Sequence, residues 1–528
     1  MSGLFSTLNV ANKGLFAAQT SLHTTGHNIS NANTRGFNRQ RVEMKASLAY
    51  NLGGVGQLGT GVKMESITRV IDDYVVKQIR NESGTFERYA SKSEVIDQLE
   101  VIFNEPSTTG LNFYLGEMFD SWQELSKNPE SLNSRTIVVE KGKALADTIN
   151  HMSRQISSLK DETVGQIEKN AKDFNAIVEK LDALNKQIFN IGVTGDVPND
   201  LLDQRDLMLQ DLGGIGNIKP SFDKYGRVTI TYADGTENGI KVLGTEATHK
   251  LSVVTEVVEN QDGTFTVSIS PGGDSLVDPV TIENLSADDM AGFELGAVLF
   301  TRMDQPIDGG NIIKNNGLIN SGRIQGNTDA LGDIDDAMNS LNQFAKTMAN
   351  AMNKIHTGDG QVADSVDFFV YDEANPSTTI TISQEIQSDH SKVLVGADYN
   401  SPEGDGSRAL AMARLRNTKL DFTSENPTLT YDPTDMSIAG NPGGITVEDG
   451  YGNIVINIGI SKEHSDNVIA NQDVLLGQLE MRRESVSGVS INEEISNVIK
   501  YQSAYEANAR VIQVLSEMLD VLINRTGV

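Results

Sequence analysis

The stretch NISNANTRGF, residues 28–37, ends a regular apolar stripe that begins at the fourth residue of the chain. Before it, apolar or small residues recur in alternating steps of four and three, at Leu4, Leu8, Ala11, Leu15, Ala18, Leu22, Thr25 and Ile29. This heptad spacing is typical of a helix that packs lengthwise against another helix. Asn, Ser and Thr side chains bond the local backbone in competition with a helix, so the sequence predicts that the helix ends here and that the chain turns.

The other end of the chain carries a second stripe with the same spacing. Ser490 and Glu493 form a capping box, which marks the start of a helix. The stripe that follows comprises Ile491, Ile495, Val498, Gln502, Tyr505, Ala509, Ile512, Ser516, Leu519 and Ile523. We therefore expect both ends to be helices that pair with each other or with copies of themselves, and the two stripes are the predicted assembly interfaces.

Whether the N-terminal helix forms alone depends on the balance between the free energy gained by burying its stripe and the free energy lost by ordering its backbone. Each large apolar residue of its stripe contributes about 1.5–3 kcal/mol when buried, whereas ordering each backbone residue costs roughly 1–2 kcal/mol. Hydrogen bonding offsets only part of that cost. The sequence thus predicts that both termini are largely disordered in the free monomer and fold on assembly.

Further helical stripes lie between the two ends. One continues from Leu145 to Gly192 after Pro129, and predicts a helix of fifty to sixty residues. Another runs from Ile334 to Ile355 and stops at Thr357-Gly358. Shorter helices are expected near residues 70–103, 113–126 and 200–212.

Two stretches alternate in the manner of strands. Residues 228–232, 251–257 and 265–269 alternate around Asp-Gly turns and predict a β module built from hairpins. A second strand-rich stretch is expected at 362–458. It ends in a hairpin formed by Ile445 and Val447 with Ile454, Ile456 and Ile458.

The predicted fold class is α+β. We expect an elongated multidomain chain with N- and C-terminal coiled-coil helices and a long-helix bundle with inserted β-rich domains. The predicted terminal coiled-coil domain comprises residues 1–65 and 485–528. A helical rod domain comprises 66–217, 290–360 and 459–484, and the two inserted β-rich regions are 218–289 and 361–458. Residues 293–333 depart from a regular helix, which leaves the boundary there open.

Composition narrows the classes of partner and site. The net charge of −29 argues against nucleic acid as a partner, because phosphate binding needs basic stripes. Lys13, Arg35, Arg39, Arg41 and Lys45 make the first fifty residues basic, which fits either solubility or docking. The chain contains no cysteine, so it has no disulfide or thiolate site. We expect no cleaved secretory signal, since no basic segment followed by an unbroken apolar stretch lies at the N-terminus. We also expect no membrane partner, since no apolar run reaches the roughly 18 residues of a membrane span.

Three patterns could carry chemistry, and each has a plainer interpretation. Gly54, Gly56 and Gly59 fit G-x-G-x-x-G, but the strand and helix of a dinucleotide site are missing around them, which favours a glycine loop. His23 and His27 share a helix face, yet no carboxylate is near in sequence, which favours interface or solvated histidines over metal ligands. Asp203, Arg205 and Asp206 lie among leucines, which indicates a structural ion pair at a helix junction. We expect no catalytic residue, no metal and no cofactor.

The opening stretch resembles the N-terminal signature of bacterial flagellar axial proteins, which form the rod, the hook and the hook–filament junction. The matching residues are Asn28, Ile29, Ser30, Asn31, Ala32, Asn33, Thr34, Gly36 and Phe37. Gly36 permits an unusual turn and Phe37 can anchor an extended segment, so the chain is expected to turn and run back along its own helix. Residues 488–524 resemble the C-terminal helix of the same family, and NDLLDQRDLMLQDL, SRALAMARLRN and the long helices resemble the junction members.

The resemblance implies a structural protein, not an enzyme, that connects the hook to the filament at the distal end of the hook. It implies export by the flagellar type III apparatus without a cleaved signal, with an export chaperone, to an extracellular location in the flagellum. The implied partners are copies of the chain in a helical tube, the hook protein, an adjacent junction protein and the filament side. A hook or rod subunit, and a secreted enzyme that uses axial ends for export, are the alternatives.

Overall fold

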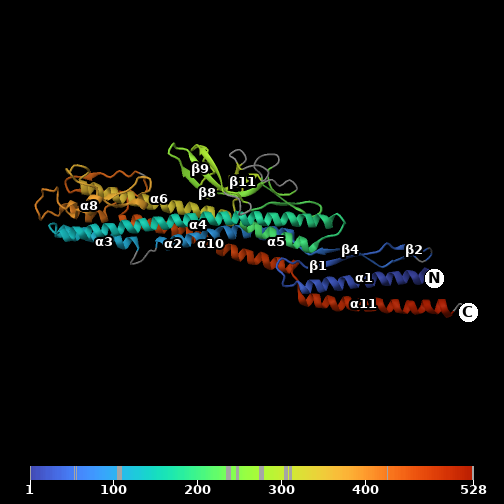
Figure 1. The fold of residues 1–528 in the computed structure, drawn as a ribbon. Coiled ribbons are helices and arrows are strands. Elements are labelled where there is room, and N and C mark those ends of the chain that lie inside the picture. The colour runs from blue at the N-terminus through green and yellow to red at the C-terminus, as the bar shows by residue number, and fades with distance from the viewer. Residues whose placement is uncertain are drawn as a thin grey trace.

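The chain folds into an elongated rod with a slender terminal domain at one end (Figure 1). The computed structural model describes residues 2–52, 54, 56–103, 110–232, 239–244, 249–272, 279–302, 307, 312–424 and 426–525. Both chain ends lie in the terminal domain, at the same extremity of the molecule (Figure 1). The α+β fold class and the elongated shape predicted from the sequence are confirmed.

The terminal domain consists of two long helices and a two-stranded ribbon. Helix α1 (Ser2–Ser30) lies beside α11 (Ile491–Asp520), which continues as a short π-helix η3 (Val521–Arg525). The ribbon pairs β1 (Gln40–Ala46) with β4 (Val62–Arg69) and, farther out, β2 (Tyr50–Leu52) with β3 (Gly56–Leu58). It runs back beside α1 (Figure 1), as expected for a chain that turns at residues 31–39.

The helical rod is built on one helix that extends along most of its length. This helix is α4 (Leu132–Gly192), whose 61 residues span about 90 Å at 1.5 Å per residue. The helices α2 (Asp73–Phe103), α3 (Leu111–Lys127), α5 (Asn199–Ile215), α6 (Gly322–Thr357) and α10 (Val447–Ser487) pack along it and each other. One continuous apolar core fills the rod, and no described residue of α1, α11 or the ribbon belongs to it.

Two antiparallel sheets project from the side of the rod (Figure 1). The smaller has the order β5 (Pro220–Phe222), β6 (Val228–Tyr232), β7 (Ile240–Leu243). The larger has the order β10-β9-β8-β11-β12, in which β8 (His249–Glu259) and β9 (Phe265–Ser270) form the predicted hairpin. Its other strands are β10 (Val280–Leu285), β11 (Val298–Arg302) and β12 (Ile312–Lys314). The β module thus extends past residue 289, so the assignment of the segments that form β11 and β12 to the helical rod was wrong.

Two asparagines of α4 attach these sheets to the rod. The Asn175 amide donates to the carbonyl of Leu251 and accepts from its N–H, at 2.8 and 3.0 Å. Asn185 does the same with Val228, at 2.8 and 2.9 Å. A buried side-chain amide therefore stands in for a neighbouring strand at one position of each sheet.

The far end of the rod is formed by residues 358–446, which are mainly loops and short helices. The helices are α7 (Pro376–Thr379), α8 (Gln384–Ser388), η1 (His390–Lys392), α9 (Ser407–Arg414) and η2 (Leu415–Asn417). The strands β13 (Phe369–Val370), β14 (Thr381–Ile382), β15 (Tyr431–Asp432) and β16 (Ser437–Ile438) have two residues each. The prediction of a strand-rich region at 361–458 was therefore wrong.

The prediction of a late hairpin at residues 445–458 was also wrong, because helix α10 begins at Val447. Thr446 caps that helix by accepting a hydrogen bond from the Asp449 N–H at 3.2 Å. The buried apolar residues in its first turns are Val447, Tyr451, Ile454 and Ile458, whereas Ile456 is exposed. The steps of four, three and four between the buried residues are helical, and the alternation of isoleucines at 454, 456 and 458 concealed them.

Two buried side chains, those of Arg408 and His356, hold the far end together. Arg408, 2% exposed, donates to the carbonyls of Ile355, Gly396 and Ala397. His356 donates from Nδ1 to the Val366 carbonyl at 2.7 Å and accepts at Nε2 from the Leu394 N–H at 2.9 Å. Burial lowers the pKa of His356 to about 4, so the imidazole is neutral at pH 7.

Candidate functional site

The candidate site is the joint between the terminal domain and the helical rod, where the stretch of residues 28–37 lies. Ser30 Oγ bonds back to the Gly26 carbonyl at 2.9 Å, and the Asn31 amide donates to the carbonyl of His27 at 3.1 Å. Thr34 Oγ1 donates to Asn31 Oδ1 at 3.2 Å, and its N–H donates to the Asn31 carbonyl at 2.9 Å. These local bonds close the last turn of α1, as predicted for this composition.

Gly36 and Phe37 complete the turn. Gly36 has a φ of 81°, and a Cβ there would lie 3.2 Å from the Cβ of Leu207 on α5. The position therefore requires both the left-handed backbone and the small size of glycine. Phe37 packs edge-on against the His27 ring, with centroids 5.4 Å apart. Asn33, the remaining member of the signature, is exposed to solvent.

Asn28 fixes the direction in which the chain returns. Its buried amide donates to the Gln40 carbonyl at 2.9 Å and accepts from the Gln40 N–H at 3.0 Å. Gln40 is the first residue of β1, so this pair of bonds aligns the ribbon with α1. The signature thus both ends the helix and positions the strand that follows.

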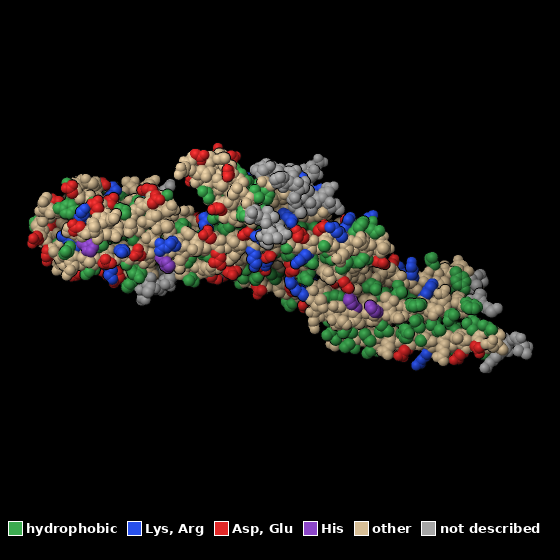
Figure 2. Space-filling model, viewed as in Figure 1, with side chains coloured by type: hydrophobic (Ala, Val, Ile, Leu, Met, Phe, Trp, Pro, Cys, Tyr) green, Lys and Arg blue, Asp and Glu red, His purple; other side chains and the backbone are tan. Residues whose placement is uncertain are grey.

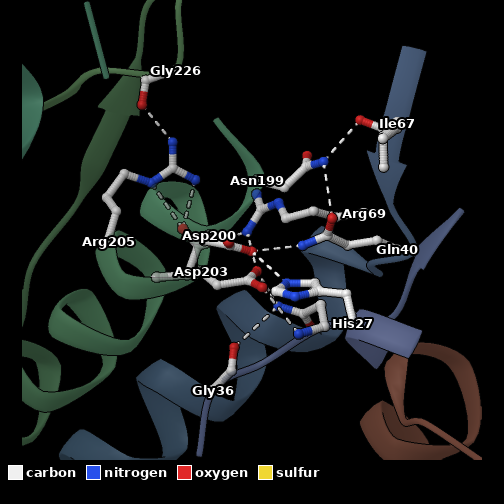
Figure 3. A network of polar contacts seen from close by, with 12 residues as sticks. His27, Gly36, Gln40, Ile67, Arg69, Asn199, Asp200, Asp203, Arg205 and Gly226 are labelled. Carbon is white, nitrogen blue, oxygen red and sulfur yellow. Dashed lines mark hydrogen bonds and ion pairs between the residues drawn. The ribbon is translucent and has the colours of Figure 1, made fainter. Parts of the chain in front are cut away.

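Helix α5 is the part of the rod on which the turn docks (Figure 3). Asp203 accepts from the Asn38 side chain at 2.6 Å, from the Asn38 N–H at 3.1 Å and from Arg69 at 2.7 Å. Arg69 also reaches Asp206 at 2.8 Å. Burial alone would lower the pKa of Arg69, but Asp206 and Asp203 outweigh it and hold the pKa above its ordinary value. The predicted ion pair at a helix junction is present, and Arg69 is its additional partner.

A second set of polar contacts lies beside it. Asp200 accepts from Gln40 at 2.7 Å and lies 3.3 Å from His27 Nε2, while Asn199 donates to the Ile67 carbonyl at 2.8 Å (Figure 3). Arg205 donates to Asp206 and to the Gly226 carbonyl, which extends the network to the β5–β6 turn. The joint is therefore a continuous polar network from α1 through α5 to the first sheet.

Helix α11 is attached to the joint by its first turn. The Arg39 guanidinium lies 3.0 Å from Glu493, and the Arg39 main-chain N–H donates to the Ser487 carbonyl at 2.9 Å. Ser490 accepts from the Glu493 N–H, so the predicted capping box is present on its N-cap side. The roles of Asn38, Gln40 and Arg69 were not predicted, because their partners lie far away along the chain, and Arg39 was noted only as one of the basic residues near the N-terminus.

The predicted N-terminal stripe faces the interior of the terminal domain. Ala11 and Ala18 are buried, and Leu4, Leu8, Leu15, Leu22 and Ile29 are half-buried. A Cβ at Gly14 would meet the Asn508 side chain at 2.7 Å, so this glycine permits close approach of α1 and α11.

The C-terminal stripe divides into a covered part and an exposed part. Val498, Ala509, Ile512 and Leu519 are half-buried, whereas Ile491, Ile495, Gln502, Tyr505 and Ile523 are exposed. The covered face also includes Glu494, Tyr501, Asn508 and Leu515. The helix is thus rotated by about one position from the predicted stripe, because 494, 501, 508 and 515 follow the same seven-residue period.

The other predicted candidates have structural surroundings. Gly54 and Gly56, with φ of 82° and 109°, lie at the β2–β3 turn, and strand β4 follows, as expected for a glycine loop. His23 is exposed, while His27 contacts Asp200, a carboxylate brought from α5. Within the described ranges, no group of side chains is arranged to hold a metal ion, and no helix is long and apolar enough to cross a membrane.

The helical rod and the C-terminal segment each match a known protein family. Residues 96–256 and 245–369 match the flagellar hook-associated protein FlgK helical domain, which together is more than half of the 528 residues. Residues 483–525 match the C-terminal region of the flagellar basal body rod FlgEFG proteins.

Full-length relatives carry related names. The chain is 28% identical over 550 residues to flagellar hook-associated protein 1 of Bacillus subtilis, covering 100% of this chain and 99% of the relative. It is 24% identical over 595 residues to that of Salmonella typhimurium, covering 98% and 99%. The structure of the flagellar hook junction protein FlgK from Burkholderia pseudomallei shares the fold, with a TM-score of 0.54 and 12% identity, covering 78% of this chain and 100% of that one. Since the helical-domain match spans more than half of its length, the chain belongs to the FlgK family of flagellar hook-associated proteins, structural components of the hook–filament junction.

Proposed function

We propose that this chain assembles at the distal end of the hook and connects the hook to the filament. Copies of the chain form a helical tube, with hook protein on one side and an adjacent junction protein and the filament on the other. The chain reaches this extracellular position through the flagellar type III apparatus, without a cleaved signal and with the help of an export chaperone. Its activity is assembly, and the proposal assigns no reaction to it.

The observation that carries the proposal is the apolar face of α11 that no described part of this chain covers. Ile495, Ile499, Val514 and Met518 are each about half exposed or more, and apolar side chains gather over the α1–α11 pair in Figure 2. An apolar strip along a helix of 30 residues is unfavourable in water and typical of a surface that binds protein. Neighbouring copies of the same helix pair would bury it in a tube.

The polar joint supports the same role. Its contacts fix how the terminal domain is oriented on the rod, so that every copy presents the same two surfaces to its neighbours. We infer that the α1–α11 pairs line the inner wall of the tube, that the rods form the next shell, and that the sheets face outward. This arrangement also agrees with the projection of the sheets from one side of the rod (Figure 1).

Two alternatives fit the observations less well. A rod or hook subunit would share the C-terminal segment, since residues 483–525 match rod proteins, but the match to the FlgK helical domain favours the junction. The second alternative is a secreted enzyme. The chain matches proteins named as hook-associated proteins over nearly their whole length, which favours a structural role instead.

Electron microscopy of flagella from cells that lack this chain tests the proposal. We expect these cells to form hooks without filaments. Expression of the full chain should restore filament growth, and expression of a chain that lacks residues 489–528 should not. Secretion of the truncated chain into the medium is the control for export. Filament growth supported by the truncated chain would contradict the proposal.

Amide exchange on the isolated monomer tests the predicted folding on assembly. We expect fast exchange across residues 4–29 in the monomer and slow exchange in assembled flagella. Strong protection of this segment in the monomer would show that the helix pair forms without neighbours.

A further inference from the structure

We propose that the tip of the ribbon docks into the pocket between α4 and α5 of a second copy of this chain. The inference rests on the proposed assembly and adds to it a specific contact between copies. The ribbon tip is defined here by Leu48, Tyr50 and Leu58, and the α4–α5 pocket by the residues that line it at the base of the ribbon.

The ribbon tip is apolar and uncovered. Leu48 is 93% exposed, and Tyr50 and Leu58, which lie opposite each other in the β2–β3 pair, are both exposed. A leucine exposed to this degree beside a cross-strand pair of a tyrosine and a leucine costs free energy in water unless a partner buries it. The tip therefore has the composition of an anchor for a protein surface.

The α4–α5 pocket has matching chemistry. Its volume is about 710 Å³, room for several large side chains. Asp200 is its only charged lining residue, and that carboxylate is engaged by Gln40 and His27. The other lining residues are the neutral polar Gln40, Gln187, Asn190 and Asn199 and the apolar Ile67, Ile191, Val197, Pro198 and Leu201, against which the tip would pack. Ile191 and Val197 are exposed at its mouth, so the pocket also lacks a cover.

The tip cannot reach the pocket of its own chain. Gln40 and Ile67 lie at the base of the ribbon, and the eight residue steps from Gln40 to Leu48 span about 26 Å of strand. Lys13 holds the far part of the ribbon along α1 by donating to the Thr60 carbonyl at 3.2 Å. Gly61 packs against the Val10 backbone, which keeps the ribbon extended.

A second copy displaced by about one ribbon length satisfies both surfaces. Such a contact joins two different patches, so each copy offers one tip and one pocket, and the contact repeats along an assembly. A head-to-tail contact of this kind is what a tube or ring of identical subunits needs. The two uncovered apolar patches and their separation along the ribbon therefore select another copy of the chain as the occupant.

Cysteine cross-linking in assembled flagella tests the contact, because the chain has no cysteine of its own. In cells that lack the wild-type chain, the double variant Leu48→Cys, Val197→Cys is expressed, and isolated flagella are oxidised with copper–phenanthroline. We expect multimers on non-reducing gels and only monomers from either single variant. The matched control pairs Val197→Cys with Val258→Cys, an exposed valine on β8.

The outcomes separate this inference from the proposed function. Normal swimming without multimers would overturn the contact and leave the junction role intact. A cross-link to a different protein would have the same meaning. Multimers in the matched control would also overturn the contact, because they would show that cross-linking does not depend on the ribbon tip. If the double variant Leu48→Cys, Val197→Cys blocks filament growth, the double variant Tyr50→Cys, Ile191→Cys is oxidised and analysed on non-reducing gels with the same expected result. As a second measurement, Leu48→Asp is expected to weaken retention in flagella by about tenfold or more while secretion of the chain into the medium continues. Unchanged retention of that variant would also overturn the contact.

Discussion

Asn28 and Gln40 are joined by two hydrogen bonds, one from the side-chain amide to the main-chain carbonyl and one from the main-chain N–H to the side-chain carbonyl. Asn353 makes the same pair of bonds with Phe369, at 2.7 and 2.9 Å. With Asn175 and Asn185 on α4, four helical asparagines thus hold four extended segments. Each satisfies a donor and an acceptor that burial would otherwise leave unpaired.

Replacement of Asn28 by alanine should loosen the ribbon. Gln40 would lose partners for both its N–H and its C=O, and each unpaired buried group costs about 1–3 kcal/mol. We expect faster amide exchange in β1 and β4 and reduced swimming. Asn33→Ala is the matched control, because this exposed residue of the same signature should change neither measurement. Equal effects of the two substitutions would contradict the assigned role of Asn28.

Removal of the Asp203 carboxylate should destabilise the joint far more than removal of a surface carboxylate. Asp203→Ala leaves Asn38 without its carboxylate partner and Arg69 with Asp206 alone, and we expect a loss of about 3 kcal/mol in the free energy of unfolding by denaturant. Asp211→Ala breaks an exposed pair with Arg35 and should cost less than about 1 kcal/mol. A double-mutant cycle of Asp203 and Arg69 should show strong coupling, and additive losses would argue against a shared network.

Two glycines of α6 should respond to alanine in opposite directions. A Cβ at Gly326 would lie 2.1 Å from the Arg88 carbonyl oxygen of α2, so Gly326→Ala must push two helices apart. Gly332 has nothing within 4 Å, and Gly332→Ala should stabilise the helix by roughly 0.5–1 kcal/mol. Thermal unfolding should therefore shift down for the first variant and up for the second. A neutral Gly326→Ala would mean that α2 and α6 are packed less closely than described.

The stability of the far end of the rod should depend on pH through His356. Its folded pKa of about 4 lies below the ordinary 6.5, so the unfolded chain binds the additional proton between these values. The contribution is complete above about pH 6.5 and is lost as the pH falls toward 4, by about 3 kcal/mol in total. Denaturant titrations from pH 7 to 4 should show this slope, His356→Gln should remove it, and His151→Gln on the exposed face of α4 should retain it.

Substitutions at an exposed and at a covered residue of α11 should affect assembly and folding differently. Ile499 is 61% exposed, so Ile499→Asp should leave the unfolding of the purified chain unchanged and prevent filament growth. Leu515 is buried against α1, so Leu515→Asp should also increase amide exchange in α1 wherever the pair is formed. Normal filaments with Ile499→Asp would show that this face is not an interface between copies.

Periodicity was sufficient for the long elements and for the turn. The stripes before residue 30 and after residue 490 correspond to α1 and α11, and the stripe ending at Gly192 corresponds to α4. Asn28, Ser30, Asn31 and Gly36 act on their own neighbourhood, so their types alone indicated a helix end and a turn. Local chemistry of this kind is readable without knowing the partner.

Long-range pairing could not be read in the same way. Asn38 and Asp203 are 165 residues apart, and nothing in either segment specifies the other. The covered face of α11 was misplaced by one position, because the line of Glu494, Tyr501, Asn508 and Leu515 includes two polar residues that an apolar pattern does not select. The short isoleucine alternation in α10 failed for a related reason: its strand and helix periods coincide over a few residues.

The polar joint determines how the molecule responds to twisting. Apolar interfaces let side chains slide past one another, but a joint made of directional bonds from Asn38, Gln40 and Arg69 to α5 loses those bonds one at a time when it rotates. Rotation of the terminal domain on the rod is therefore resisted by these directional bonds, in addition to the packing of the Gly36 turn against Leu207.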